Sequence, residues 1–163
     1  MEMRDVRLVG LISDTHGLLR DEALQALHGV DLILHAGDVG KPEILETLKT
    51  LAPVVAVRGN IDTAPWAKEL PATAVVEAGP VTFYILHDAH DLDLNPKAAG
   101  FQCVVSGHSH QPGSIERDGV LYINPGSAGP RRFKLPISLA RLDLRDTPWK
   151  VKFIDLEKPR EED

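Results

Sequence analysis

The sequence predicts an α/β fold in which two mixed sheets pack face to face and helices lie outside them. In the first third, apolar runs alternate with segments of helical periodicity, and this β-α-β-α-β order favours parallel strands joined by right-handed crossovers. Beyond Pro71 the apolar runs come in closely spaced pairs, which favours antiparallel hairpins. A parallel part followed by hairpins indicates two sheets, with the loops at the strands' carboxyl ends converging on a site between them.

Five elements are expected in the first third of the chain. The clearest is the second helix, because Pro42 stands near its first turn and Ile44, Leu45, Leu48 and Leu51 form one apolar stripe. The three strands are short apolar runs. The expected order is strand 6–13, helix 21–27, strand 32–36, helix 41–51 and strand 54–57.

The remaining elements are mostly strands that pair with their neighbours along the chain. Gly79-Pro80 joins the first pair, and Asp118-Gly119 is a strong two-residue hairpin signal in the second. A helical turn is expected near residues 97–100. The expected strands are 73–77 with 81–86, a single strand 101–106, 115–117 with 120–123, and a closing pair 137–144 with 151–156.

The bulk composition fits one globular domain. A chain of 163 residues is long enough for one core, so we assign residues 1–156 to a single domain and residues 157–163 to a charged, frayed tail. No apolar run has the length of a membrane span, and no signal-peptide segment precedes the first strand. The single cysteine, Cys103, fits a reducing compartment and a core position, so we expect a cytoplasmic protein. The net charge of −6 argues against nucleic-acid binding.

Five polar clusters follow the apolar runs, each at the end of an expected strand. Together they supply two carboxylates, one amide and four imidazoles, which is the ligand inventory of a two-metal hydrolytic site. Side chains two residues apart in an extended segment point the same way, so each D-x-H or H-x-H pair can reach one metal. The clusters are Asp14-Thr15-His16, Gly37-Asp38, Gly59-Asn60, His87 and Gly107-His108-Ser109-His110.

The ligand types narrow the choice of metal. Asp38 is the natural bridging carboxylate between two ions. With Asp14 it contributes two negative charges, so two divalent ions would leave a net positive site that binds a phosphoryl oxygen. A mixed nitrogen and oxygen set suits manganese, iron, cobalt, nickel or zinc better than magnesium or calcium. We expect two divalent ions, with manganese as the first choice.

These motifs, in this order, resemble the calcineurin-like metallophosphoesterases. The length and the Asn124-Pro125-Gly126-Ser127 segment are most similar to the small YfcE-like phosphodiesterase branch. The resemblance implies a four-layer α-β-β-α sandwich, and a metal-bridging hydroxide that attacks phosphorus. It also implies two ligand sets that share Asp38. One is Asp14, His16, Asp38 and His110, and the other is Asp38, Asn60, His87 and His108.

The chain departs from the family pattern at three places. Ile61 follows the motif asparagine, where many members have a histidine that protonates the leaving group, and Asp62 is then the nearest titratable neighbour. Asp88 replaces the glycine that usually follows the strand-end histidine. It can support a metal-bound histidine or make the site less attractive to anions. His90 is displaced by one residue and is not assigned as a ligand.

The sequence therefore predicts a metal-dependent phosphodiesterase that acts on a small phosphate ester. Its predicted catalytic residues are Asp38, Asn60 and His108, of which Asp38 positions the nucleophile and His108 touches a phosphoryl oxygen. Two alternatives stay open at this stage. One is a phosphomonoesterase or cyclic-nucleotide phosphodiesterase, and the other is a non-catalytic interaction scaffold of the same fold. The resemblance also allows a homo-oligomer.

Overall fold

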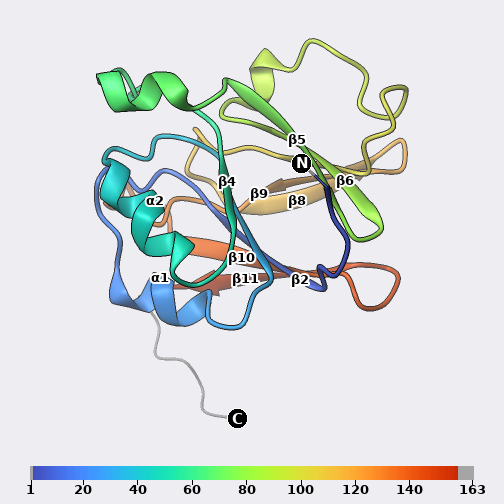
Figure 1. Cartoon of the computed structure of the whole chain (residues 1–163), viewed down its shortest axis with the longest axis horizontal. Coiled ribbons are helices and arrows are strands. Elements are labelled where there is room, and N and C mark those ends of the chain that lie inside the picture. The colour runs from blue at the N-terminus through green and yellow to red at the C-terminus, as the bar shows by residue number, and fades with distance from the viewer. Residues whose placement is uncertain (1, 158–163) are drawn as a thin grey trace.

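The computed structural model describes residues 2–157 and forms two mixed sheets packed face to face (Figure 1). The predicted tail is described only at Glu157, since residues 158–163 lie outside the described part of the chain. The five-stranded sheet has the order β11 (Lys150–Asp155), β10 (Ser138–Asp143), β2 (Leu8–Ile12), β3 (Leu32–His35), β4 (Val54–Ala56). The six-stranded sheet has the order β1 (Glu2–Met3), β5 (Thr73–Ala78), β6 (Val81–Leu86), β7 (Cys103–Val105), β9 (Val120–Asn124), β8 (Gly113–Arg117).

The predicted β-α-β-α-β unit forms one half of the five-stranded sheet. Strands β2, β3 and β4 are parallel, and helices α1 (Asp21–Ala26) and α2 (Pro42–Lys49) connect them. Helix α2 begins at Pro42, and the missing N–H of proline costs nothing there because the first turn of a helix has no intrahelical acceptor for it. The helix buries one apolar face. The predicted closing pair, β10 with β11, joins this sheet because β10 runs antiparallel to β2. The helices of the described residues are too short to cross a bilayer.

The second sheet contains both predicted hairpins, and it also contains three parallel strands that the sequence pattern did not predict. β5 pairs antiparallel with β6, and β8 with β9. The β8–β9 turn has positive φ at both Asp118 (51°) and Gly119 (78°), as a two-residue hairpin of this type requires. Strands β6, β7 and β9 are parallel to one another, because longer connections return the chain to the same end of the sheet. The short β1, which the sequence analysis missed, adds parallel to β5.

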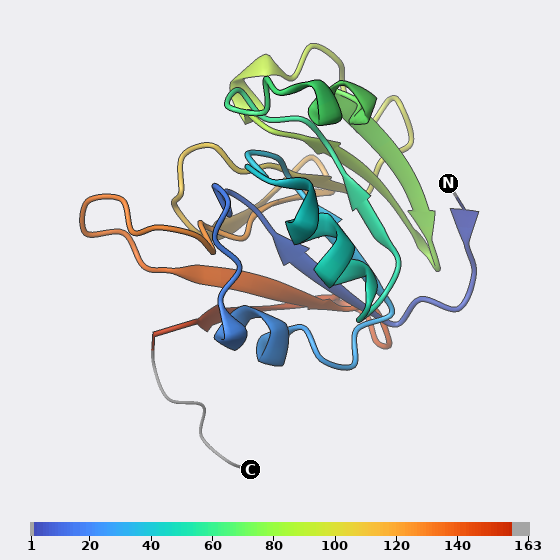
Figure 2. The ribbon, with the colours of Figure 1, turned by 60° about the vertical axis from the view of Figure 1, so that its left-hand side comes forward.

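Apolar side chains fill three layers. The main core lies between the sheets and includes Leu11, Phe83 and the predicted core residue Cys103. A second core lies between the five-stranded sheet and the two helices, where Gly10 lets α1 approach closely: a Cβ at that position would lie 2.5 Å from Leu27 Cδ2. In both views the β5–β6 hairpin and the β10–β11 pair lie far apart, on opposite sides of this packed centre (Figure 2).

The outer face of the six-stranded sheet is covered by irregular chain. Residues 88–102 cross it with one 3₁₀ turn, η2 (Ala89–Asp91), and place Leu92, Leu94 and Phe101 on its apolar surface. The predicted helical turn near residues 97–100 belongs to this segment and forms a hydrogen-bonded turn. The fourth layer of the sandwich is therefore a loop.

Candidate metal centre

The structure brings all seven predicted ligands to one edge of the sandwich. Asp14 and His16 follow β2, Asp38 follows β3 and Asn60 follows β4, while His87 ends β6 and His108 and His110 follow β7. Strands from both sheets therefore supply the site. Two groups have ligand atoms within 4.8 Å of one another, namely Asp14 with His16 and His110, and Asp38 with His87 and His108.

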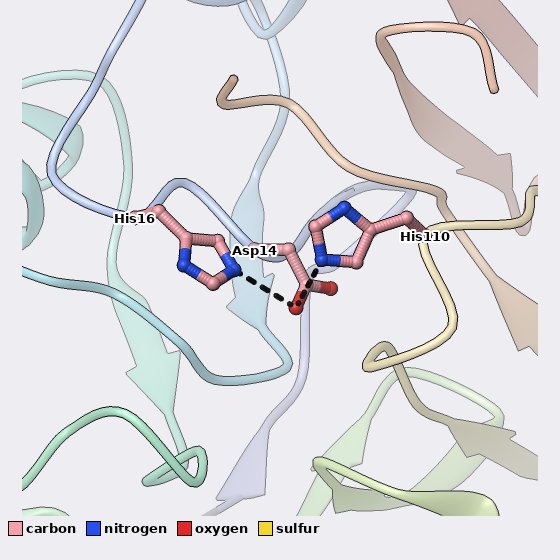
Figure 3. Close-up of side chains that lie close together, drawn as sticks. All are labelled: Asp14, His16 and His110. Carbon is pink, nitrogen blue, oxygen red and sulfur yellow. Dashed lines mark ion pairs between the residues drawn. The ribbon is translucent and has the colours of Figure 1, made fainter. Parts of the chain in front are cut away.

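Asp14 is the centre of the first group. Its carboxylate is fully buried, and Oδ1 lies 3.4 Å from His110 Nε2 and 3.7 Å from His16 Nε2 (Figure 3). The other oxygen, Oδ2, accepts hydrogen bonds from the Ser13 hydroxyl at 2.8 Å and the His108 backbone N–H at 3.1 Å. Protein donors thus hold one oxygen and leave the other directed at the two imidazoles.

Asp38 is arranged in the same way and lies between the two groups. Its Oδ1 accepts a hydrogen bond from the Ile61 backbone N–H at 3.0 Å. Its Oδ2 lies 3.2 Å from His87 Nε2 and 3.4 Å from His16 Nε2, so one oxygen faces an imidazole from each group. A carboxylate in this position is suited to bridging two ions.

The ring nitrogens of the second group have defined roles. His87 Nδ1 lies 2.8 Å from the Ala36 carbonyl, which only accepts, so Nδ1 carries a proton, and in the neutral ring Nε2 has a lone pair for a metal ion. His108 Nδ1 lies 3.3 Å from that Nε2 and 3.2 Å from Asn60 Oδ1. Three possible metal-ligand atoms therefore converge at this point.

Unpaired polar atoms show that the residues fit metal ions. Asp14 Oδ1, His16 Nε2 and both ring nitrogens of His110 are buried without a hydrogen-bond partner among the described residues. Burying such atoms unpaired is unfavourable, so they indicate a missing cationic partner. Nitrogen and oxygen donors together suit divalent transition metals. The centre thus contains two possible metal-ligand groups.

Without a bound metal, the aspartates and histidines of the centre stabilise each other's charged forms. Burial raises the pKa of Asp14, but the adjacent His110 and His16 imidazoles outweigh that effect, and the pKa lies well below its ordinary value. Burial also raises the pKa of Asp38, and hydrogen bonds from His87 and the Ile61 N–H bring it below the ordinary value. The Asp14 carboxylate raises the pKa of His16, and Asp38 raises that of His87 against the effect of burial. The two aspartates are therefore ionised and ready to bind cations.

The backbone is strained at the same residues. Among the described residues, seven that are not glycine have positive φ, and five of them are predicted ligands. Two glycines permit close approach of the loops: a Cβ at Gly59 would lie 2.1 Å from Asp38 Oδ1, and one at Gly107 would lie 2.5 Å from Asp14 Oδ2. Strain of this kind persists where surrounding structure holds it, and it gathers at functional sites. The five strained ligand candidates are Asp14, His16, Asp38, His108 and His110.

Supporting residues around the centre were only partly visible in the sequence. Asp62, the neighbour considered as a proton donor, is 4% exposed and instead accepts three backbone N–H groups, from Val39, Gly40 and Gly59. It ties the loop after β3 to the loop after β4. The sequence offers no signal for this role, because it depends on where the two loops meet.

A hydrogen-bonded chain beneath the centre involves His35. The Gly37 backbone N–H donates to His35 Nδ1 at 3.1 Å, and His35 Nε2 lies 3.0 Å from Thr15 Oγ1. The Thr15 hydroxyl in turn donates its hydrogen to the Val39 carbonyl. This pattern requires a neutral ring with its proton on Nε2. Burial lowers the pKa of His35 to about 4, which agrees with that tautomer. His35 is therefore a buried residue that supports the loops carrying the ligand candidates.

Asp88 and His90 lie beside the centre and differ in role from the ligand candidates. Asp88 Oδ1 accepts a hydrogen bond from the His90 backbone N–H and lies 3.0 Å from its Nδ1. Asp88 Oδ2 lies 3.6 Å from His108 Nε2, on the side of the ring away from Asn60. The His90 side chain is 95% exposed and belongs to neither ligand group.

Two cavities open from the centre, and both are lined by Asn60 and His108. The larger has a volume of about 560 Å³ and extends past Arg58 and Tyr84 toward the segment after β6. The smaller has about 300 Å³ and lies on the other side, beside Ile61 and Arg132. A group bound at the centre therefore has room for one substituent on each side.

The comparisons with known proteins agree with this geometry. Residues 8–147 match the family model described as the calcineurin-like phosphoesterase superfamily domain. A protein of Methanocaldococcus jannaschii named a probable metallophosphoesterase is 36% identical over 166 residues, which cover 93% of this chain and 82% of that protein. A phosphodiesterase of the same organism is 29% identical over 136 residues, covering 72% of this chain and 82% of its own.

The same architecture occurs in a protein named for vacuolar sorting. The crystal structure of Vps29 from Chaetomium thermophilum superposes with a TM-score of 0.73 at 18% identity, covering 91% of this chain and 97% of that one. At this identity the likeness concerns the fold alone. It confirms two mixed sheets with few helices as the architecture.

Proposed function

Because the chain belongs to the calcineurin-like phosphoesterase superfamily, we propose that it is a two-metal hydrolase of phosphate diesters. The observation that carries the proposal is the pair of ligand groups that face one oxygen of Asp38. A carboxylate in this position would hold both ions, and two ions together would supply charge stabilisation for displacement at phosphorus.

Seven residues would hold the ions. Manganese is the first candidate, with iron, nickel, cobalt or zinc as alternatives. When bound, the two ions lower the pKa of a water between them and neutralise the phosphoryl oxygens. One ion would be held by Asp14, His16, Asp38 and His110, and the other by Asp38, Asn60, His87 and His108.

The protein's own side chains orient the substrate. The Ile61 N–H holds Asp38 Oδ1, so Oδ2 is the oxygen that Asp38 would offer to the ions. His108 stands where the two cavities meet, with 43% of its side chain exposed, so it is the ligand best placed to touch a phosphoryl oxygen. Asn60 lines both cavities and contributes an uncharged oxygen.

The cavities favour a diester over a monoester. A phosphodiester carries two substituents on phosphorus, and the centre has a cavity on each side. A monoester would leave one cavity unused. The similarity to a protein named phosphodiesterase supports the same choice.

Among the described residues, the smaller cavity has no side-chain acid outside the ligand groups that could protonate a leaving group there. In the smaller cavity, the lining residues outside the ligand groups are Ile61, Pro130, Arg131 and Arg132, together with Asn60. Asp62 is occupied by three backbone donors. We therefore expect substrates whose leaving groups are stable as anions to react fastest, since they need no proton in the transition state.

The test is hydrolysis of bis-p-nitrophenyl phosphate by metal-stripped protein, with manganese, nickel, cobalt, zinc and magnesium added back. The monoester p-nitrophenyl phosphate is measured in parallel. We expect metal-dependent cleavage of the diester over the monoester. Asp38→Ala should lower kcat/KM by about 10³-fold or more, while Asp146→Ala, an exposed aspartate, should have no effect. Full metal-dependent turnover in Asp38→Ala would overturn the assignment.

The second candidate is an interaction scaffold. Ile61 is 42% exposed beside the centre, and an exposed apolar side chain at a site rim suits a protein contact better than proton transfer. Folded protein that binds two ions and cleaves neither ester with any of the five metals would favour this candidate.

A further inference from the structure

The larger cavity has a wall that the metal centre does not use. One end opens on Asn60, His87 and His108. The far wall is formed by β6 and by the segment that follows it, and Arg58 closes another side. The residues of this wall are Tyr84, Leu86, Asp88, Asp91 and Asp93. A volume of about 560 Å³ is within the range of small-molecule sites.

Tyr84 supplies an unpaired hydroxyl to this wall. The residue is only 7% exposed, and its ring stacks on Phe101 with centroids 5.1 Å apart and planes 8° from parallel, which fixes its position. Its hydroxyl has no hydrogen-bond partner among the described residues, and it is not among their fully buried unpaired atoms. Because Tyr84 is held in place and lines the cavity, a ligand in the cavity can supply the hydrogen-bond partner that the described residues do not.

The charge of the wall selects the type of ligand. Three carboxylates face one guanidinium, and Arg58 already donates from Nη1 to the Leu70 carbonyl at 3.2 Å. A substituent with a second phosphate would meet like charges there. Asp91 and Asp93 are exposed, so an alkyl chain would displace water from these carboxylates and from Tyr84 without replacing its hydrogen bonds. The wall is therefore rich in hydrogen-bond acceptors and suits a substituent rich in donors.

We propose that this cavity binds a polyhydroxylated alcohol as one arm of the diester, with its hydroxyl groups on Tyr84, Asp91 and Asp93. The inference rests on the proposed function, because it requires the phosphate to lie at the metal centre. Hydroxyl groups in a row offer several donors and no charge, which matches several carboxylates beside one tyrosine. These three residues would then determine specificity without touching phosphorus.

The experiment compares three diesters that share p-nitrophenol as leaving group and differ in the other arm, which is glycerol, ethanol or 2-aminoethanol. The manganese-loaded full chain should cleave the glycerol ester with kcat/KM at least about 10-fold above the ethyl ester. Tyr84→Phe and Asp93→Asn should each lower that ratio several-fold. The matched controls Tyr122→Phe and Asp146→Asn lie outside the cavity and should leave the ratio unchanged. Metal content is measured for every variant as a control. In calorimetry, glycerol 3-phosphate should bind the metal-loaded protein more tightly than ethyl phosphate does.

Each alternative outcome is distinct. Cleavage of the ethyl and glycerol esters at equal rates, with equal product binding, overturns this inference and leaves the proposed function intact. Preference for the 2-aminoethyl ester also overturns it, because the carboxylates would then select a cation. Cleavage of none of the three esters by metal-loaded protein overturns the proposed function and this inference with it.

Discussion

At the scale of single residues, the centre is built from side chains whose backbone is unfavourable. Asp14, His16 and Asp38 have φ values of 55°, 47° and 55°, and His108 and His110 have 69° and 61°. Residues other than glycine rarely adopt such values, and asparagine, aspartate and histidine tolerate them best. Each strained residue brings a ligand atom to the centre. The local conformation is therefore explained by the chemistry of the site and not by stability.

Gly59 provides a test of how tightly the ligands are packed. Gly59→Ala would place a Cβ 2.1 Å from Asp38 Oδ1, so the carboxylate must move. We expect a loss of about 3 kcal/mol in the free energy of unfolding and weaker metal binding, measured by chemical denaturation and equilibrium dialysis. The control is Gly113→Ala in β8, where a Cβ meets nothing within 4 Å and the change should stay within about 0.5 kcal/mol. Equal stabilities for the two variants would contradict the packing seen here.

His35 predicts a pH dependence of stability. Its pKa is about 4 in the folded protein, below the ordinary value of 6.5, so the unfolded chain binds more protons between these values. Stability from this residue is therefore lost as the pH falls from 6.5 toward 4. The expected loss is about 2 kcal/mol between pH 7 and pH 5.

The measurement is denaturation of metal-free wild type and His35→Leu at both pH values. The change in unfolding free energy between the two pH values is compared for the two proteins. The difference isolates the contribution of His35, because His16 and His87 titrate in both. Their raised pKa values act in the opposite direction and add stability at low pH. If the variant lost as much stability as the wild type on acidification, the neutral buried imidazole would be the wrong description.

At the scale of elements, the loops after β3 and β4 form one unit because Asp62 joins them. Both of its oxygens accept backbone N–H groups, two from residues 39 and 40 and one from residue 59. The loops carry Asp38 and Asn60, so a side chain outside the ligand set positions two ligand candidates at once. A carboxylate suits this place, since it accepts at both oxygens and donates at neither.

Asp62→Asn separates this structural role from proton transfer. The amide directs an N–H group at a backbone N–H, so we expect about 2–3 kcal/mol lower stability and weaker metal binding, measured by thermal unfolding and calorimetry. Asp31→Asn serves as a comparison, since Asp31 also accepts two backbone donors but lies away from the centre. Both donors reach the same oxygen, Oδ2, which the amide oxygen of asparagine can replace, so Asp31→Asn should keep both its stability and its metal affinity. A fully stable Asp62→Asn protein with only its turnover reduced would instead indicate a proton donor.

At the scale of the whole molecule, the candidate metal centre lies where the two sheets meet. Asp14 and Asp38 follow strands of the five-stranded sheet, while His87, His108 and His110 follow strands of the six-stranded sheet. Ions shared between these residues would link the halves of the sandwich at one edge. Because the unfolded chain lacks this arrangement, metal binding should stabilise the fold.

Removal of metal should therefore lower the thermal stability of the whole chain. At a free metal concentration of 100 times Kd, each ion contributes about 2.7 kcal/mol, which corresponds to a Tm change of about 5–10 °C for a chain of this size. Calorimetry with and without a chelator measures the shift. Asp38→Ala should reduce it most, since that residue faces both groups. A Tm that is independent of metal would contradict a loaded centre.

The sequence alone determined the order of elements and the inventory of ligands, because both are local properties. Apolar periodicity distinguishes strand from helix, as in α2 and β2, and turn residues such as Asp118-Gly119 specify a hairpin between neighbouring strands. The two-residue spacing pairs Asp14 with His16 as predicted, but the same argument fails for His108 and His110, which belong to different ligand groups. These predictions needed no knowledge of distant contacts.

Only the tertiary structure decided how distant segments meet. The parallel placement of β6, β7 and β9, the loop that replaces a helix over the outer face, and the joining of two loops by Asp62 all depend on contacts between residues far apart in the chain. The place of Tyr84 in the cavity wall also depends on tertiary structure, since a tyrosine within an apolar strand cannot be told from a core residue by its sequence. Periodicity and spacing describe near neighbours, whereas cavities and carboxylate partners arise only when the sheets pack against each other.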